Sequence, residues 1–208
     1  MKVLLINGSP NAKGCTYTAL QEVAKQLEEQ NIRTELLHVG NEPILGCTAC
    51  RSCSDGKCAF DNDLINATLG KAKEADGFIF GSPVHFAGAS GQITAFLGRF
   101  FFAGRMGKYF ENKPGAAIVS CRRGGATATF DQINKYFSIS NMPIVSSQYW
   151  NMVHGNTPEE VKQDLEGMQT MRTLGKNMAW LLKSIKAGKD AGLPLPERET
   201  RIATNFIR

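Results

Sequence analysis

The 208-residue sequence predicts an α/β fold in which an open parallel sheet carries helices on both faces. Two observations predict it. Short apolar runs alternate along the chain with longer segments of helical period, which is typical of strand–helix–strand units that bring parallel strands into one sheet. Several apolar runs also end in loops rich in glycine and small polar residues, and ligands bind beyond the carboxyl ends of such strands.

Five segments have the composition of buried strands. The first, KVLLIN at residues 2–7, is an apolar run that ends at Gly-Ser-Pro, as expected of a strand covered on both faces. The remaining segments are RTELLHV, GFIFG, GAAIVS and a run that begins with a proline. The five predicted strands are residues 2–7, 33–39, 77–81, 115–120 and about 143–147.

Helical segments separate these strands. In residues 16–29 the apolar side chains of Leu20, Val23, Ala24 and Leu27 recur at the spacing of one helix face. Similar segments follow the later strands, and the chain ends in a long one. The further predicted helices are residues 64–74, 92–102, 128–137 and 158–185.

Composition restricts the possible function classes. Hydrophobic residues make up 42% of the chain and charged residues 21%, which is ordinary for a globular domain. The net charge of +5 is scattered, with no dense basic run and interleaved aromatics, so a nucleic-acid partner is not expected. No stretch approaches the roughly 20 apolar residues of a membrane span, and MKVLLINGSP lacks the pattern of a signal peptide. We therefore expect a cytoplasmic protein that does not bind membranes.

The chain is expected to form one main domain. We assign residues 1–185 to this domain, with a cysteine-rich loop at residues 46–62. Residues 186–208 are expected to form a C-terminal arm or tail, in which Phe206 and Ile207 favour an arm that packs on a partner subunit.

Three loops are predicted to meet at one edge of the sheet, because they follow the first, third and fourth strands. Their sequences are GSPNAKGCT, SPVHFAG and CRRGGAT. The first leads into a helix, whose free N–H groups and dipole favour a phosphate dianion, and Ser9 and Thr16 could add hydroxyl donors. The loop matches neither G-x-x-x-x-G-K-[ST] nor G-x-G-x-x-G, which argues against a nucleoside triphosphate or a dinucleotide. The alternative interpretation is a plain helix cap.

Four of the six cysteines fall within GCTACRSCSDGKC. They are Cys47, Cys50, Cys53 and Cys58. Reduced thiols are expected in the cytoplasm, which argues against disulfides, and the spacing is tight for structural zinc. The pattern C-x2-C-x2-C-x4-C would let one loop wrap a four-iron cubane. Zinc or another metal, redox-active thiols, and a three-plus-one site completed by Cys15 or Cys121 remain alternatives.

A family resemblance enters with these motifs. GSPNAKGCT, SPVHFAGASGQITAFLGR and the later RRGG resemble the flavodoxin-like NADPH-dependent FMN reductase family over roughly residues 1–185. With CTACRSC-x4-C inserted after the second strand, the chain most resembles the iron–sulfur flavoprotein branch of that family. The resemblance implies a three-layer sandwich around a five-stranded parallel sheet of order 2-1-3-4-5, bound FMN, and a homodimer or homotetramer.

The resemblance also implies which residues hold the flavin. The phosphate would bind the first loop through Ser9, Asn11, Gly14, Cys15 and Thr16. The isoalloxazine ring would be lined by Pro83, Val84, His85, Phe86 and Gly88. Its other side would be closed by Ser120, Arg122, Gly124 and Gly125. Two positions depart from the family pattern, since His85 stands where an aromatic residue is frequent and Gly98 where an aspartate is frequent.

The sequence therefore predicts an FMN-dependent oxidoreductase. It would pass electrons between FMN and a [4Fe–4S] cluster, and exchange them with a small-molecule or protein partner such as ferredoxin. The flavin would carry out the redox chemistry, and His85 is the one candidate side chain for a proton donor. One alternative is an NAD(P)H-dependent reductase of FMN, quinones or nitro compounds that lacks a cluster. A second is a flavin-binding redox sensor.

Overall fold

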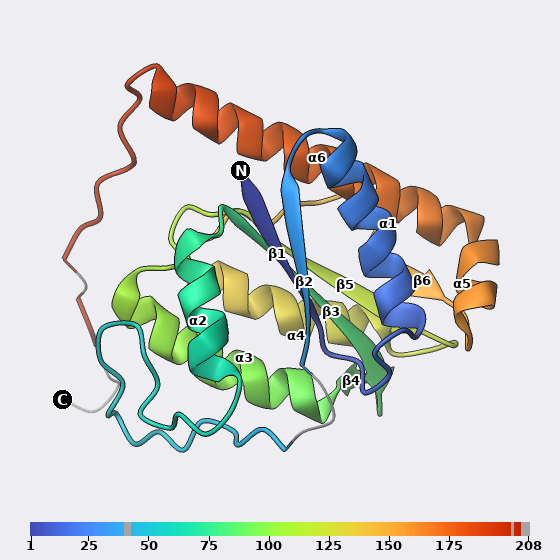
Figure 1. Ribbon diagram of the computed structural model, residues 1–208, viewed down its shortest axis with the longest axis horizontal. Coiled ribbons are helices and arrows are strands. Elements are labelled where there is room, and N and C mark those ends of the chain that lie inside the picture. Colours follow the sequence, from blue (N-terminus) through green and yellow to red (C-terminus); the bar gives the residue numbers. More distant parts are fainter. Residues whose placement is uncertain (40–42, 201, 205–208) are drawn as a thin grey trace.

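A computed structural model describes residues 1–39, 43–200 and 202–204 (Figure 1). Its sheet has five parallel strands in the order β2-β1-β3-β5-β6. These strands are β1 (Lys2–Asn7), β2 (Arg33–His38), β3 (Gly77–His85), β5 (Gly115–Cys121) and β6 (Met152–His154). Counted among parallel strands alone, this is the predicted order 2-1-3-4-5. The structure adds one short strand, β4 (Gly88–Ala89), which pairs antiparallel with the end of β3.

The fifth predicted strand, at residues 143–147, was misplaced. This segment pairs with β5 at a single residue, Gly115, and forms no strand. Gly115 N–H donates to Pro143 O at 2.9 Å, and Val145 N–H donates to Gly115 O at 2.9 Å. The chain then leaves the sheet, and β6 returns beside residues 119–121 at the other end of β5. A polar turn separates the two places, and its Ser147 hydroxyl binds the Asn151 side chain at 2.7 Å.

Helices cover both faces of the sheet. One layer holds α1 (Cys15–Glu29), α5 (Pro158–Gln163) and α6 (Leu165–Asp190). The opposite layer holds α2 (Ile65–Glu74), α3 (Gly91–Gly104), the 3-10 turn η1 (Arg105–Gly107) and α4 (Ala126–Ile139). Successive side chains of β1 point to opposite layers. Val3 and Leu5 pack toward α1 and α6, whereas Leu4 and Ile6 pack toward α2 and α3.

The core on the α2–α3 side is aromatic. Phe78 and Phe80 of β3 meet Phe100 of α3 at ring-centroid distances of 6.4 and 6.0 Å. Phe110, after η1, lies 5.1 Å from Phe100 and 5.4 Å from Phe78. All four side chains are buried, so the sequence FFFAGRMGKYF at 100–110 contributes largely to the core.

The long final helix predicted at residues 158–185 is two helices. Asp164 has non-helical backbone angles and separates α5 from α6. Its carboxylate accepts one hydrogen bond from Gly167 N–H at 2.9 Å, which caps α6, and another from His154 N–H of β6 at 2.6 Å. Asp164 therefore starts the helix and also ties the edge strand to it. The second helix, α6, ends at Asp190.

After α6 the chain turns back along the side of the molecule toward α3 (Figure 1). Arg198 in this segment pairs with Glu111, which follows η1. Phe206 and Ile207, on which the expected arm rested, lie outside the described residues. Among the residues with described structure, none of the helices has the length and apolarity needed to cross a bilayer.

Replacing Asp164 with alanine should destabilise the fold. The change removes an N-cap and the bond to β6, so we expect the free energy of unfolding to fall by about 1–2 kcal/mol in urea titrations. Gln169→Ala, at an exposed position of the same helix, serves as the control and should stay within about 0.5 kcal/mol of wild type. Equal losses for the two variants would contradict the double role of Asp164.

Candidate functional site

The three predicted loops do meet at the carboxyl edge of the sheet. Gly8 N–H donates to Gly81 O at 2.8 Å, and the Ser90 hydroxyl donates to Gly8 O at 2.6 Å, so the residues on either side of the second loop hold the start of the first loop. A Cβ on Gly8 would lie 2.5 Å from Cβ of Ile93, so this close approach requires glycine. The first and third loops are joined by Thr16 Oγ1 and Ser120 Oγ, 2.7 Å apart.

The N-terminus of α1 is open to an anion. Gly14 is its N-cap, and among the residues that the structure describes no side-chain hydrogen bond caps the helix. Thr16 is buried against Ser120, and the Ser9 hydroxyl accepts a hydrogen bond from Asn11 N–H at 3.1 Å. Neither Ser9 nor Thr16 therefore caps this helix, as the alternative interpretation would have required. The unpaired N–H groups and the helix dipole suit a phosphate, as the loop sequence predicted.

Two side chains that the sequence analysis missed hold this loop in place. Asn7 is fully buried; its amide group donates to Ala12 O at 3.1 Å and accepts from Ser9 N–H at 3.0 Å. His38 Nε2 lies 2.7 Å from Ser9 O and must donate, because a carbonyl oxygen only accepts. In the sequence, these two residues could have been identified as polar side chains at or next to the end of two predicted strands, Asn7 in β1 and His38 in β2.

The second and third loops offer exposed groups at the same edge. The side chain of Phe86 is fully exposed, and both Phe86 and Ala87 have left-handed backbone angles, with φ of 50° and 58°. Non-glycine residues in this conformation are strained and gather at binding sites. Gly125 has φ of 92°, and a Cβ there would lie 2.7 Å from Cα of Ala87.

The other predicted flavin residues divide by exposure. His85, Gly124 and Arg122 are exposed at the edge, where a ligand can reach them. Pro83, Val84 and Gly88 are half-buried beside them. Ser120 and Thr16 are buried, and their hydroxyls bind each other, so these side chains hold the first and third loops together beneath the exposed edge. Together the loops fit a group that combines a phosphate with a flat ring, as FMN does.

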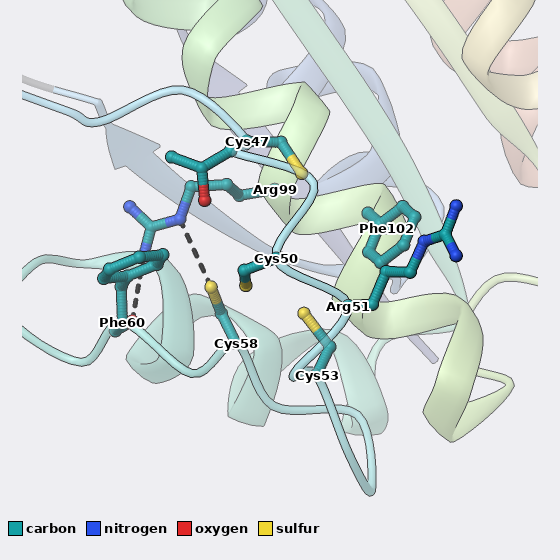
Figure 2. A pocket seen from close by; sticks show the side chains of 9 residues that line it. Cys47, Cys50, Arg51, Cys53, Cys58, Phe60, Arg99 and Phe102 are labelled. Carbon is teal, nitrogen blue, oxygen red and sulfur yellow. Dashed lines mark hydrogen bonds between the residues drawn. The ribbon is translucent and has the colours of Figure 1, made fainter.

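The four clustered cysteines line one small pocket (Figure 2). Thr48, Arg51, Phe60, Arg99 and Phe102 complete its wall. Of the four thiols, Cys58 is the most buried at 7% exposure, Cys53 is half-buried, and Cys47 and Cys50 are exposed. Within the described ranges, no three His, Cys, Asp or Glu side chains are grouped closely enough to hold a single metal ion.

The two remaining cysteines lie elsewhere. The Cys15 thiol donates to Gly155 O at 3.6 Å, and the Cys121 thiol donates to Gly124 O at 2.9 Å, both at the carboxyl edge of the sheet. Neither lines the cysteine pocket. The structure therefore brings together Cys47, Cys50, Cys53 and Cys58, and it does not place Cys15 or Cys121 beside them as the three-plus-one alternative would require.

The backbone of the cysteine loop is strained. Ala49, Arg51 and Asp55 have left-handed φ values of 53°, 59° and 50°. Each such non-glycine residue costs roughly 1–2 kcal/mol. Turns of this kind direct successive N–H groups into concavities that bind anions, including many iron–sulfur clusters.

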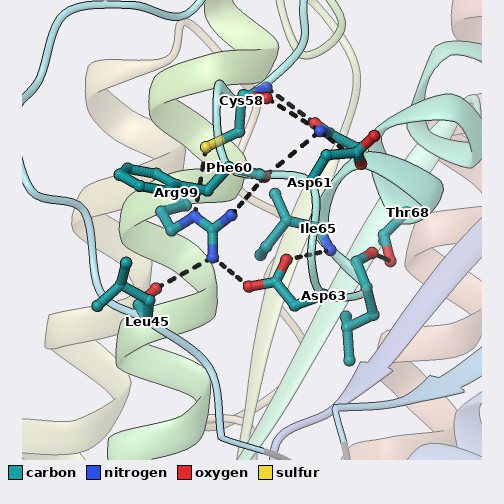
Figure 3. A network of polar contacts seen from close by, with 10 residues as sticks. Leu45, Cys58, Phe60, Asp61, Asp63, Ile65, Thr68 and Arg99 are labelled. Carbon is teal, nitrogen blue, oxygen red and sulfur yellow. Dashed lines mark hydrogen bonds and ion pairs between the residues drawn. The ribbon is translucent and has the colours of Figure 1, made fainter.

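A buried ion pair fastens this loop to the domain (Figure 3). The Arg99 guanidinium, 2% exposed, pairs with Asp63 and donates to Leu45 O at 3.3 Å and to Phe60 O at 2.8 Å. Its Nε–H donates to the Cys58 sulfur at 3.3 Å (Figures 2 and 3). The sequence analysis assigned Arg99 no role, although an arginine three residues after Phe96 on an apolar helix face signals a buried charge that needs partners.

Gly98, one of the two positions that depart from the expected family pattern, lies beside the cysteine loop. A Cβ added there would lie 3.8 Å from Cβ of Cys47, which is an ordinary contact, so the local space does not require glycine.

The thiols differ in acidity. Burial raises the pKa of the Cys15 thiol above its ordinary value, and the carboxylates of Glu160 and Glu159 raise it further. Burial likewise raises the pKa of Cys53. The pKa of Cys50 is lowered, mainly by a hydrogen bond from the Ser52 backbone.

These directions predict an order of alkylation in protein stripped of cofactors. Because the thiolate is the reacting form, iodoacetamide should modify Cys50 before Cys15 at pH 7, as read by peptide mass spectrometry. The difference should shrink as the pH rises through the raised pKa of Cys15. In guanidinium chloride the two should react alike, which provides the control. Equal rates in the folded protein at pH 7 would contradict the assignment.

Comparisons with known proteins agree with this geometry. The family model for NADPH-dependent FMN reductase matches residues 1–157. An iron–sulfur flavoprotein of Methanocaldococcus jannaschii is 36% identical over 194 residues, which cover 89% of this chain and 100% of the relative. An iron–sulfur flavoprotein of Methanosarcina thermophila is 30% identical over 196 residues, which cover 91% of this chain and 100% of the relative.

Solved structures share the fold at low sequence identity. RosB, bound to 8-demethyl-8-formylriboflavin-5'-phosphate, aligns with a TM-score of 0.71 at 14% identity, over 100% of this chain and 92% of RosB. A WrbA-like flavodoxin of Agrobacterium tumefaciens aligns with a TM-score of 0.61 at 15% identity, over 88% of this chain and 97% of that protein. The fold is therefore flavodoxin-like, and the chain belongs to the NADPH-dependent FMN reductase family, as an FMN-dependent oxidoreductase of its iron–sulfur flavoprotein branch.

Proposed function

We propose that this oxidoreductase holds FMN at the carboxyl edge of the sheet and a [4Fe–4S] cluster in the cysteine pocket, and passes electrons between them. The observation that carries the proposal is that Cys47, Cys50, Cys53 and Cys58 line one pocket. FMN exchanges two electrons or one, and the cluster exchanges one at a time, so together they connect two-electron and one-electron partners.

The donor set suits a cubane. A [4Fe–4S] cluster takes four thiolates, each bound to a different iron atom, so its ligand sulfurs are spaced around a cluster rather than around one ion. The left-handed turns at Ala49 and Arg51 and the buried Arg99 cation favour an anionic group at this place. The names of the two relatives described above support the same proposal.

The FMN phosphate is proposed to bind above the first turn of α1, with Ser9 as a neutral donor. The Ser9 oxygen already accepts from Asn11 N–H, which leaves its own O–H to donate to the phosphate. Cys15 and Thr16, in the first turn of α1, would contribute backbone N–H groups. The exposed Phe86 and the loop that contains Gly124 would lie against the ring.

Ser9→Ala should weaken FMN far more than riboflavin, which lacks the phosphate. Loss of a hydrogen bond to a charged group costs roughly 1.5–3 kcal/mol, about ten- to a hundredfold in affinity, measured by calorimetry on flavin-free protein. Thr18→Ala is the matched control, because its hydroxyl donates to Gly14 O inside the helix at 3.1 Å. An equal loss of both flavins in Ser9→Ala would contradict the assignment.

Protein made and purified without oxygen should carry about four irons and four acid-labile sulfides per chain. Cys50→Ala should lose the cluster and keep FMN, because the flavin rests on other loops. Ser54→Ala, an exposed change in the same loop, should keep both. Anaerobic protein with full flavin but neither iron nor sulfide after reconstitution would reject the cluster.

The electron partner is proposed to be a small acidic carrier such as ferredoxin. Arg51, on the wall of the cysteine pocket, and Lys57, next to Cys58, are both exposed and place positive charge near the proposed cluster. Steady turnover with reduced ferredoxin, or with NAD(P)H, separates an enzyme from a redox sensor that does not turn over. Turnover with reduced ferredoxin that is lost in Cys50→Ala would separate the proposed enzyme from a cluster-free reductase.

A further inference from the structure

We infer that Arg99 is the positioning residue of the proposed cluster: it holds Cys58 ready as a ligand and raises the reduction potential through its hydrogen bond to sulfur. The inference deepens the proposed function and rests on it. It starts from one contact, Arg99 Nε–H to Cys58 Sγ at 3.3 Å (Figure 3).

Arg99 holds both ends of the cysteine loop. One terminal nitrogen donates to Leu45 O, two residues before Cys47, and the other donates to Phe60 O, two residues after Cys58. The planar guanidinium fixes these directions together, which an ammonium on a flexible stem does not do. The loop is therefore closed at its base by a group that also reaches one of the thiols.

Cys58 is fixed from its backbone as well. Its N–H donates to Asn66 Oδ1 at 2.8 Å, and its carbonyl accepts from Asn66 Nδ2 at 2.9 Å. Asn66 belongs to α2 and Arg99 to α3, so two helices of the domain hold this one cysteine. Cys58 is thus the preformed ligand, around which the more exposed Cys47 and Cys50 would close.

The same geometry sets the electrostatics. A reduced cluster carries one more negative charge than an oxidised one, and hydrogen bonds to its sulfurs stabilise that charge and raise the potential. Asp63, which pairs with the terminal nitrogen that also donates to Leu45 O, opposes this effect with its own charge. Arg99 and Asp63 should therefore shift the potential in opposite directions, whereas a purely structural pair would shift it in the same direction or not at all.

The test measures the cluster potential by redox titration with EPR detection, on anaerobic protein with FMN bound. Asp63→Asn, which keeps an oxygen to accept from Ile65 N–H, should raise the potential. Arg99→Met in the Asp63→Asn background leaves no unpaired buried charge, and should lower the potential relative to Asp63→Asn alone. We expect about a tenfold change in the one-electron equilibrium, which is about 59 mV. Arg99→Lys in the same Asp63→Asn background keeps a positive charge, so it should recover part of the potential that Arg99→Met loses.

Arg105→Met is the matched control. Arg105 follows α3, is exposed, and stacks on the pocket-wall residue Phe102 at 4.2 Å without reaching a cysteine. Its loss should change the potential much less than the loss of Arg99. A cluster potential that is the same with and without Arg99, or that moves equally in Arg105→Met, would overturn the inference.

A second measurement does not depend on the cluster. In cluster-free wild type, iodoacetamide should modify Cys58 more slowly than Cys47, and the Arg99→Met/Asp63→Asn protein should lose this difference. Equal labelling in wild type would overturn the positioning role. Anaerobic wild type without iron would overturn the cluster and the effect on its potential, while the labelling would still decide whether Arg99 holds Cys58.

Discussion

The Arg99 guanidinium lies inside the domain, on a helix whose neighbouring side chains are apolar, so its N–H groups require acceptors there. The acceptors come from Asp63 and from both ends of the cysteine loop. The loop has little regular structure, and Arg99 shares the role of holding it with Asn66, which bonds to the Cys58 backbone. Removing one member of such a buried pair typically costs 3–5 kcal/mol, because the other charge is left without a partner. The buried pair thus links the base of the cysteine loop to the domain, and the Cys58 thiol lies directly on this cation.

The two proposed cofactor sites are built by different means. The flavin edge depends on close backbone approach, which is why Gly8 and Gly125 stand where a Cβ would collide. The cysteine pocket depends on side chains, four of them thiols, with Arg99 at the base. Helix α3 joins the two, because its N-cap Ser90 binds Gly8 O and its ninth residue is Arg99. The rise of a helix separates these two points by roughly 14 Å. One rigid element thus sets the spacing between them.

The corrected elements have a common cause. Pro143 and Val145 hydrogen-bond to β5, yet the pairing strand lies at Met152–His154. Both runs have strand-like residues, but residues 143–145 bond only to Gly115, whereas residues 152–154 pair with residues 119–121. Asp164 divides the last helical segment for a similar reason, since its carboxylate binds a backbone N–H of β6. Contacts between segments that are distant in the chain decided both outcomes.

The sequence alone determined the strand–helix alternation, the order of the parallel strands through the family resemblance, the three loops at the carboxyl edge and the grouping of the four cysteines. The alternation, the loops and the cysteine grouping follow from local periodicity, turn residues and spacing, which are properties of short segments, whereas the strand order came from the resemblance alone. The tertiary structure alone decided that Thr16 binds Ser120 across two loops, that His38 holds Ser9, and that Arg99 reaches Cys58 from a helix 41 residues away. Hydrogen-bond partners far apart in sequence leave no periodic trace, because they are chosen by which polar groups burial brings together.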